Sequence, residues 1–458
     1  MDDHLRSVSF KASRGSKTTP SKSTFSSKKL EIACSIIIVF QITTVSLYIF
    51  YTGTKPPGRV TRVGKHEEVS PLDDPSCYLK DKLETPQLPT VHSIFADPFT
   101  NEVVVVGVRL WFERWLTEAF LCEFRGTRDE VFMSLTDPML EDFQRFGATP
   151  QYIIIMTCPL PKALYGVPKF NMTLRRILNS TTTLSYENIT VCQTGQRESK
   201  PNYLSMCTMV KNMDAAVPPW LEYHRKYGVE HVYIYDNANP ATSTLRQSLR
   251  RFVEGGFLTI IPWGHDHSPR KTYLEVQIAH ENDCLWRNRH RSEWMIKIDV
   301  DEFLQPMDPS MNLISDVIRR YSPVGARIGS LRIQNWFFCH GRKQPKKRNM
   351  NQHESVFERN QYSSRKPTPV NMGRDKAVVR PTNVHFFKIH GVKLGGDTIT
   401  LCPRTEMRMV HYRGDNRLHP GFKCSDSQPL KDSSMCRLWA QAKGVNPNSS
   451  DPDGLNCI

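Results

Sequence analysis

Short apolar runs alternate with longer helical patterns between residues 203 and 300, and this alternation constrains the fold more than any other feature of the chain. The apolar runs include His231–Tyr235, Phe257–Pro262 and Trp294–Ile298. The segments with the length and periodicity of helices are 215–227, 242–253 and 271–289. Strands that alternate with helices predict βαβ units and a parallel sheet. The sequence therefore predicts an α/β fold for this part of the chain.

An acidic motif, Asp299-Val300-Asp301-Glu302, follows the last of these apolar runs. Carboxylates at positions i and i+2 of a strand end point to one side, where they can share a hard cation such as Mn²⁺ or Mg²⁺. Such an ion neutralises a diphosphate and helps a nucleoside diphosphate to leave. A solvated turn is the other interpretation of a lone Asp-X-Asp motif. Asp236 closes an earlier strand and, because ligands bind beyond the carboxyl ends of parallel strands, is expected in the same crevice.

Five motifs follow one another in this part of the chain. They are Cys207-Thr-Met-Val-Lys-Asn212, Trp220-Leu-Glu-Tyr-His224, Gly228-Val-Glu-His-Val-Tyr-Ile-Tyr-Asp236, Asp283-Cys284-Leu285 and Trp294-Met-Ile-Lys-Ile-Asp-Val-Asp-Glu-Phe303. Together they resemble glycosyltransferase family 92. The resemblance implies a GT-A fold, which is Rossmann-like with a mostly parallel sheet, and an inverting, Mn²⁺-dependent transfer of galactose from UDP-galactose. It is strongest to the plant enzymes that form the β-1,4-galactan side chains of pectin in the cell wall.

The resemblance also implies roles for single residues. Asp299 and Asp301 match the positions that hold the metal and the diphosphate, with Mn²⁺ or Mg²⁺ as the ion. Asp236 matches the residue that meets the uridine or its ribose, and its other interpretation is a turn or helix-cap residue. Asp283 matches a position that faces the donor, whereas its pattern alone indicates a polar helix face. His411 is the preferred third protein ligand of the metal, since a neutral imidazole suits Mn²⁺.

Inversion needs a general base that takes the proton from the acceptor hydroxyl. The carboxylates that follow the acidic motif, and that spacing does not separate, are Asp375, Asp397, Glu406 and Asp415. We choose Asp397 because Gly395 and Gly396 let the backbone approach a ligand closely, although an ordinary turn explains the same pattern. Lys297 interrupts the apolar strand, which indicates an edge strand or a lysine whose ammonium reaches water.

The N-terminal part of the chain predicts a membrane anchor. Residues 32–51 carry no charged side chain and are long enough to cross a bilayer. The tail of residues 1–31 is basic, which predicts that it stays in the cytosol and that the rest is lumenal. A short span of this kind fits the Golgi membrane and a single-pass type II topology. We expect a stem over residues 52–90, a β-rich accessory domain over 91–200 and a glycosyltransferase domain over 201–458 with a Cys-containing tail.

A lumenal location agrees with the glycosylation and cysteine patterns. Sequons for N-glycosylation begin at Asn171, Asn179, Asn188 and Asn448. Of the 12 cysteines, only Cys34 lies in the predicted anchor. The remaining cysteines predict disulfides in an oxidising compartment, and their odd number predicts at least one that is free or pairs between chains. The pairing does not follow from the sequence.

The expected partners are a UDP-sugar, a glycan acceptor and the membrane. The basic run at residues 342–348 is interpreted either as a solvated loop or as a surface that attracts an acidic acceptor such as a pectic polymer. We exclude nucleic acid because the catalytic part is predicted to be lumenal. A homodimer is compatible with an anchored transferase, although no motif indicates one. Two alternative functions stay open: a GT-A transferase that uses another UDP-sugar, and a catalytically silent Golgi scaffold that binds glycans.

Overall fold

A computed structural model describes a large part of the chain, and all described residues belong to one compact unit within Glu67–Ile458. The described residues are 77, 79, 82–85, 88–110, 119–126, 130–136, 140–144, 151–177, 183–194, 200–263, 273–322, 327–339, 355–370, 372–412, 415–416, 419–420, 429–447, 455 and 457. Among them no helix is both long and apolar enough to cross a membrane. The predicted anchor at residues 32–51 lies outside the described residues.

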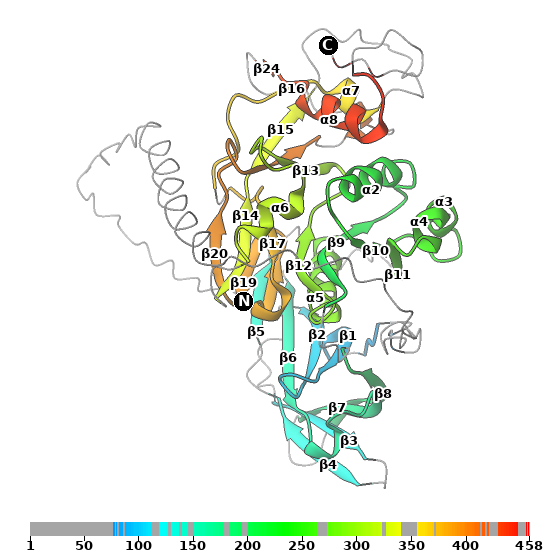
Figure 1. Ribbon diagram of the computed structural model, residues 1–458. Coiled ribbons are helices and arrows are strands. Elements are labelled where there is room, and N and C mark those ends of the chain that lie inside the picture. The colour runs from blue at the N-terminus through cyan, green and yellow to red at the C-terminus, as the bar shows by residue number, and fades with distance from the viewer. Residues whose placement is uncertain are drawn as a thin grey trace, which may run out of the picture. The chain divides into compact units, whose positions relative to one another are not determined.

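A seven-stranded sheet forms the centre of the C-terminal part, in the order β11-β10-β9-β12-β17-β14-β20 (Figure 1). Its strands are β9 (Asn202–Val210), β10 (His231–Asp236), β11 (Leu258–Pro262), β12 (Ser292–Lys297), β14 (Ile328–Ile333), β17 (Lys376–Val379) and β20 (Asp397–Thr400). The pairings among β11, β10, β9 and β12 are parallel, as is that of β14 with β20, whereas β17 is antiparallel to both neighbours. The predicted mixed α/β fold is confirmed.

Helices connect the first four strands of this sheet. They are α2 (Val217–Lys226), α3 (Leu245–Ser248), α4 (Arg250–Glu254) and α5 (Tyr273–Arg287). Helix α2 has proline in its first turn and buries Trp220, Leu221 and Tyr223 against the sheet. It ends before Gly228, which has a positive φ of 95° and lies so close to Ser315 that a Cβ would meet its Oγ at 2.6 Å. Glycine is therefore required on both counts.

A second sheet continues directly from the acidic motif, in the order β13-β21-β15-β16-β24. Its strands are β13 (Glu302–Pro306), β15 (Asn335–Cys339), β16 (Tyr362–Ser363), β21 (Met407–His411) and β24 (Leu430–Lys431). The remaining elements of this part are α6 (Ile314–Arg319), α7 (Val356–Arg359), α8 (Ser434–Lys443), η5 (Pro381–Asn383), β18 (Phe386–Lys388), β19 (Gly391–Leu394), β22 (Asp415–Asn416) and β23 (His419–Pro420). Antiparallel pairing of β13 with β21 sets Glu302 opposite His411. Residues more than 100 positions apart in sequence thus become neighbours.

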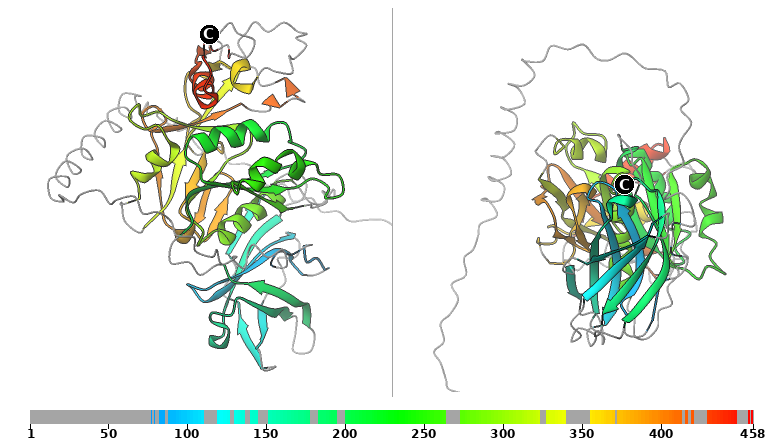
Figure 2. Two further views of the ribbon diagram at one scale, coloured as in Figure 1. Left: turned by 45° about the vertical axis from the view of Figure 1, so that its right-hand side comes forward. Right: turned by 90° about the horizontal axis from the view of Figure 1, so that it is seen from below.

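Residues 90–192 form two four-stranded antiparallel sheets, in the orders β1-β2-β6-β5 and β4-β3-β7-β8. Their elements are β1 (Thr90–Asp97), β2 (Glu102–Leu110), β3 (Ala119–Arg125), β4 (Val131–Leu135), β5 (Leu140–Gln144), β6 (Gln151–Pro159), η4 (Lys162–Leu164), β7 (Lys169–Ile177) and β8 (Thr183–Cys192). Strands β1, β2 and β6 lie next to α5 (Figure 2). Asp97, at the end of β1, forms an ion pair with Arg289 at 3.2 Å and accepts a hydrogen bond from His290 at 2.9 Å.

Disulfides link several of these elements. The described pairs are Cys77–Cys192, Cys122–Cys158, Cys207–Cys284 and Cys436–Cys457. The exposed sequon residues Asn171 and Asn188 lie on β7 and β8. Residues 52–76 and the stretch of aromatic residues at 111–115 lie outside the described residues.

Candidate active site

Asp236 and the acidic motif lie at the same edge of the main sheet. In the strand order β11-β10-β9-β12, later strands lie on both sides of β9. The chain crosses from β9 through α2 to β10 on one side, and from β11 through α5 to β12 on the other. Such a switch point opens a crevice beyond the carboxyl ends of the two strands. Asp236 is the last residue of β10, and Asp299 follows β12 by two residues. The topology therefore brings these two predicted residues to the same edge of the sheet, where a ligand crevice is expected.

Asp236 is half-buried and its carboxylate organises the turn after β10. One oxygen accepts the backbone N–H of Ala238 at 3.0 Å, and the other accepts the hydroxyl of Ser243. Strand pairing sets Asp236 beside Val210, the last residue of β9. Asp236 therefore acts as a turn residue, as its alternative interpretation predicts. Its place at the carboxyl end of β10 also suits a contact with a ligand at this edge of the sheet.

Two lysines hold the carboxylate of Asp299. Lys376 on β17 lies 2.7 Å from one oxygen, and Lys297 at the end of β12 lies 3.3 Å from the other. Burial alone would raise the pKa of Asp299, but the two ammonium groups lower it well below its ordinary value. The backbone N–H of Asp299 donates to Glu302 at 2.8 Å and closes the turn of the motif. Asp299 is thus ionised and already paired.

The two lysines belong to a larger buried charge network. Lys297 also pairs with Glu281 of α5 at 3.0 Å, and Lys376 with Glu302 at 3.4 Å. Both lysine side chains are only 2% exposed. Burial lowers the pKa of Lys376, but the neighbouring carboxylates, Asp299 first, raise it above its ordinary value. The prediction of an edge or water-reaching Lys297 is wrong, because β12 is an interior strand with β9 and β17 on its two sides.

Asp301 and His411 face each other across the β13–β21 pairing. His411 Nε2 lies 3.4 Å from an Asp301 carboxylate oxygen, and His411 Nδ1 donates to the side-chain oxygen of Asn335 at 3.0 Å. Burial lowers the pKa of His411, but Asp301 and Glu302 raise it above its ordinary value. The bond to Asn335 orients the ring so that Nε2 points to Asp301. An outer partner that fixes a histidine in this way is typical of metal ligands.

The donor set fits a divalent ion in part. Two ligands at right angles around Mg²⁺, at bonds of about 2.1 Å, lie roughly 3 Å apart, close to the 3.4 Å between Asp301 and His411. Asp299 is less suited to bind a metal than Asp301, because lysines already pair with both of its carboxylate oxygens. Within the described ranges no three His, Cys, Asp or Glu side chains are grouped as a metal site. Asp301 and His411 are therefore the two predicted metal ligands that the structure brings next to each other.

The structure does not bring Asp283 to this crevice. Its side chain is fully buried, accepts two hydrogen bonds of 2.8 Å from Arg287 and accepts the hydroxyl of Tyr235. These partners join α5 to β10. The geometry corrects the donor-facing interpretation of Asp283 and gives the carboxylate a structural role instead.

Asp397 lies at the opposite end of the sheet from Asp299. Ser330 of β14 pairs with both Val379 and Thr398, and Val379 pairs with Met295, so Thr398 is level with Met295. Asp299 lies four residues beyond Met295, which is roughly 13 Å along the strand direction. Three strand spacings, roughly 14 Å, separate β12 from the strand β20 that carries Thr398. Asp397 lies one residue farther away, is 62% exposed and pairs with Arg327 at 3.5 Å. This position corrects the choice of Asp397 as the base.

The other candidate carboxylates differ in position. Glu406 accepts the Cys402 N–H at 2.7 Å and the Tyr321 hydroxyl, and it precedes the end of β21 that is far from His411. Asp375 directly precedes Lys376 and is therefore at the same end of the sheet as Asp299. His390, the second choice as metal ligand, contacts the carbonyl oxygen of Asp375 at 3.0 Å.

Sequence reasoning missed the residues that support the motif from other elements. Lys376 contacts Asp299, Asn335 contacts His411, and Glu281 contacts Lys297, the other lysine beside Asp299. The sequence signal that pointed to Lys376 was its position directly before the apolar run Ala377–Val379. Glu281 and Asn335 lie in no pattern that separates them from other polar residues.

A family model for glycosyltransferase family 92 matches residues 201–433, a range that contains Asp236, Asp299, Asp301 and His411. The chain belongs to this family. The resemblance inferred from the sequence motifs is thereby confirmed, and with it the assignment of the chain to the glycosyltransferases.

Several relatives match parts of the chain. A family 92 protein of Ricinus communis is 29% identical over 149 residues, which cover 32% of this chain and 24% of that protein. Beta-1,4-galactosyltransferase galt-1 of Caenorhabditis elegans is 23% identical over 256 residues, 54% of this chain and 58% of the relative. Galactan beta-1,4-galactosyltransferase GALS3 of Arabidopsis thaliana is 26% identical over 212 residues, 43% and 38% of the two chains. The match thus spans about a quarter to about three fifths of these relatives.

Among solved structures, a mannosyltransferase from Pyrobaculum calidifontis in complex with GDP-Man and Mn²⁺ is 12% identical, with 48% of this chain and 62% of that chain covered and a TM-score of 0.27. A superposition with so low a score supports no conclusion about this protein.

Proposed function

We propose that this protein is an inverting, metal-dependent galactosyltransferase of GT-A fold that moves galactose from UDP-galactose to a glycan and extends β-1,4-galactan. The observation that carries the proposal is the facing pair Asp301 and His411, 3.4 Å apart, at the sheet edge where β10 also ends in Asp236. Family membership supports the reaction class, and the galactosyltransferases among the relatives support galactose as the sugar. The parallel half-sheet β11-β10-β9-β12 supports the GT-A fold.

Each residue has a distinct task in this proposal. Asp301 and His411 hold Mn²⁺ or Mg²⁺, and the ion, when bound, neutralises the diphosphate and stabilises the departing UDP. Asp236 accepts a hydrogen bond from the uridine or its ribose. Asp299 does not bind the metal with both oxygens, because Lys297 and Lys376 hold it. Its task is to position the turn that carries Asp301, through its backbone N–H bond to Glu302.

The general base belongs at the same end of the sheet as Asp301. Of the carboxylates considered from the sequence, Asp375 meets this requirement and Asp397 and Glu406 do not, whereas the side chain of Asp415 lies outside the described residues. We therefore transfer the role of base from Asp397 to Asp375.

The uncharged residues 32–51 and the basic tail before them support a Golgi location with a type II anchor. The two accessory sheets are proposed to assist with glycan binding.

The test is the release of UDP and the growth of β-1,4-galacto-oligosaccharides by the purified full chain with UDP-galactose and Mn²⁺. Asp301→Ala should reduce turnover by about 100-fold or more, because even outer partners of metal ligands typically contribute 10- to 100-fold. Asp397→Ala is the matched control and should keep full activity. Activity that survives Asp301→Ala, or is lost in Asp397→Ala, would refute this site.

A further inference from the structure

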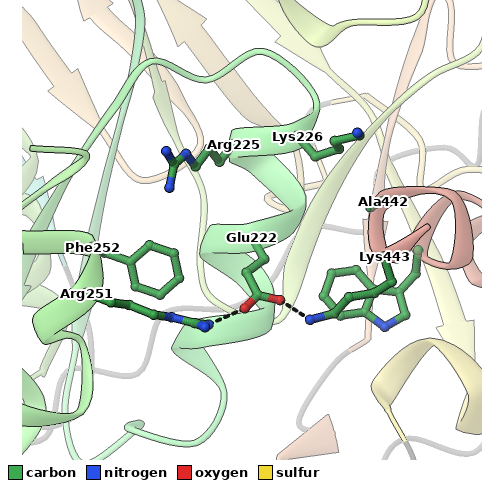
Figure 3. Close-up of a pocket in the computed structure, with 8 residues that line it drawn as sticks. Glu222, Arg225, Lys226, Arg251, Phe252, Ala442 and Lys443 are labelled. Atoms are coloured by element: carbon green, nitrogen blue, oxygen red, sulfur yellow. Dashed lines mark hydrogen bonds and ion pairs between the residues drawn. The ribbon is translucent and has the colours of Figure 1, made fainter. Parts of the chain in front are cut away.

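A cationic groove lies between α2, α4 and α8 (Figure 3). Its volume is about 620 Å³, within the range of about 300–1,000 Å³ that is typical of ligand sites. Four cationic side chains and one carboxylate line it: Arg225, Lys226, Arg251, Lys443 and Glu222. Three separate elements contribute these cations, so their convergence is a product of the tertiary fold.

Glu222 compensates only part of this charge. Its carboxylate lies between Arg251 and Lys443 and pairs with both, as the dashed lines in Figure 3 show. Arg225 and Lys226 have no carboxylate partner within the described part of the chain, and Arg225 instead lies over the ring of Phe257, 5.3 Å from its centre. The dipole of α2 favours cations in its last turn. It does not account for the arrival of Arg251 and Lys443 from two other helices.

Two of these cations lie over aromatic rings of their own helices. Arg251 lies 4.7 Å from the centre of the Phe252 ring, and Lys443 lies 4.9 Å from that of Trp439. Both rings are nearly covered, with 3% and 4% exposed, so they form a floor rather than a stacking surface.

The groove is separate from the crevice that holds Asp301. Arg225 and Lys226 lie in the last turn of α2, which returns from the carboxyl end of β9 toward the start of β10. Helix α8 follows the range that the family model matches, residues 201–433, and Cys436 within it is tied to Cys457. Three of the eight lining residues, Trp439, Ala442 and Lys443, thus come from a segment beyond the shared family region.

We propose that this groove binds an anionic polysaccharide, a glycan chain that carries carboxylate or sulfate groups. The choice of a glycan rests on the proposed function, because a polymer that is extended in one crevice gains effective concentration from a second contact elsewhere on the enzyme. Successive acidic groups along the chain meet Arg225 and Lys226, and then displace Glu222 from Arg251 and Lys443. The groove holds the glycan, and the crevice carries out the transfer.

The experiment measures binding to the purified full chain by calorimetry at low ionic strength, with no donor sugar present. The probes are a galacturonic acid oligosaccharide, dextran sulfate, a neutral β-1,4-galacto-oligosaccharide and inorganic phosphate. Arg225→Gln with Lys226→Gln should weaken binding of the acidic probes by about tenfold. Glu222→Gln should strengthen it, because two cations lose their internal partner. Arg327→Gln with Lys393→Gln is the control, since it removes the same charge from exposed positions elsewhere.

Opposite effects of the Glu222 and Arg225/Lys226 variants, with an unchanged control, would support the groove. An equal loss in the control would show attraction by net charge alone and would overturn the proposal. Displacement of the oligosaccharide by inorganic phosphate at the same concentration of charge would reduce the groove to a simple ion site and would also overturn it. The binding assay uses no UDP-galactose, so its result is independent of whether the chain transfers galactose.

Discussion

Replacement of Lys376 by methionine should destabilise the protein strongly. The ammonium of Lys376 is 2% exposed and pairs with Asp299 at 2.7 Å and with Glu302 at 3.4 Å. Methionine fills similar space, but it leaves Lys297 as the remaining cation of the network beside Asp299, Glu302 and Glu281. Loss of one partner of a buried ion pair leaves an uncompensated charge and typically costs about 3–5 kcal/mol. We therefore expect the free energy of unfolding to fall by about 4 kcal/mol.

Urea unfolding of the full chain, followed by tryptophan fluorescence, measures this loss. The matched control is Arg250→Met, which breaks an exposed pair with Glu254 in which the arginine is 76% exposed. Exposed pairs of this spacing contribute about 0.3–0.5 kcal/mol. A loss for Lys376→Met as small as that of Arg250→Met would refute the argument that Asp299 depends on its lysines.

Two further predictions concern other buried groups. Burial lowers the pKa of His224 to about 3 from 6.5, so below pH 6.5 the unfolded state binds a proton that the folded state excludes, and stability falls as the pH falls. Between pH 7 and pH 5 this effect amounts to about 2 kcal/mol, and His224→Leu should remove it from the unfolding free energies; an unchanged difference would contradict the assignment. Cys436→Ser opens the disulfide to Cys457, which closes 21 residues, and should cost about 3 kcal/mol in thermal unfolding. An equal transition temperature with and without this bond would contradict that expectation.

Local patterns predicted the first half of the main sheet, because each of its strands and helices is contiguous in sequence. Apolar runs place the strands β10, β11 and β12, and the helical patterns before β10 and before β12 match α2 and α5. The acidic motif was found for the same reason. His411 was found only through the family resemblance, since its approach to Asp301 depends on the pairing of β21 with β13.

The errors came from properties that the sequence does not encode locally. Asp397 was chosen for its flexible glycine neighbours, but strand register decides the end of the sheet at which it lies. Asp283 is on a helix whose polar side meets Tyr235 and not the crevice. Lys297 was judged by its own strand, whereas its burial depends on β17 and α5, which bring Lys376 and Glu281 to it.

The central claim is that the crevice beside Asp301 and His411 binds a nucleotide diphosphate together with a divalent ion. Calorimetric titration of UDP into the full chain, with Mn²⁺ and then with a chelator, tests it most directly. The account predicts binding that needs the metal and that falls by about 100-fold in both Asp301→Ala and His411→Ala, with Asp397→Ala unaffected. Metal-independent binding of UDP, or binding that both variants retain, would contradict it.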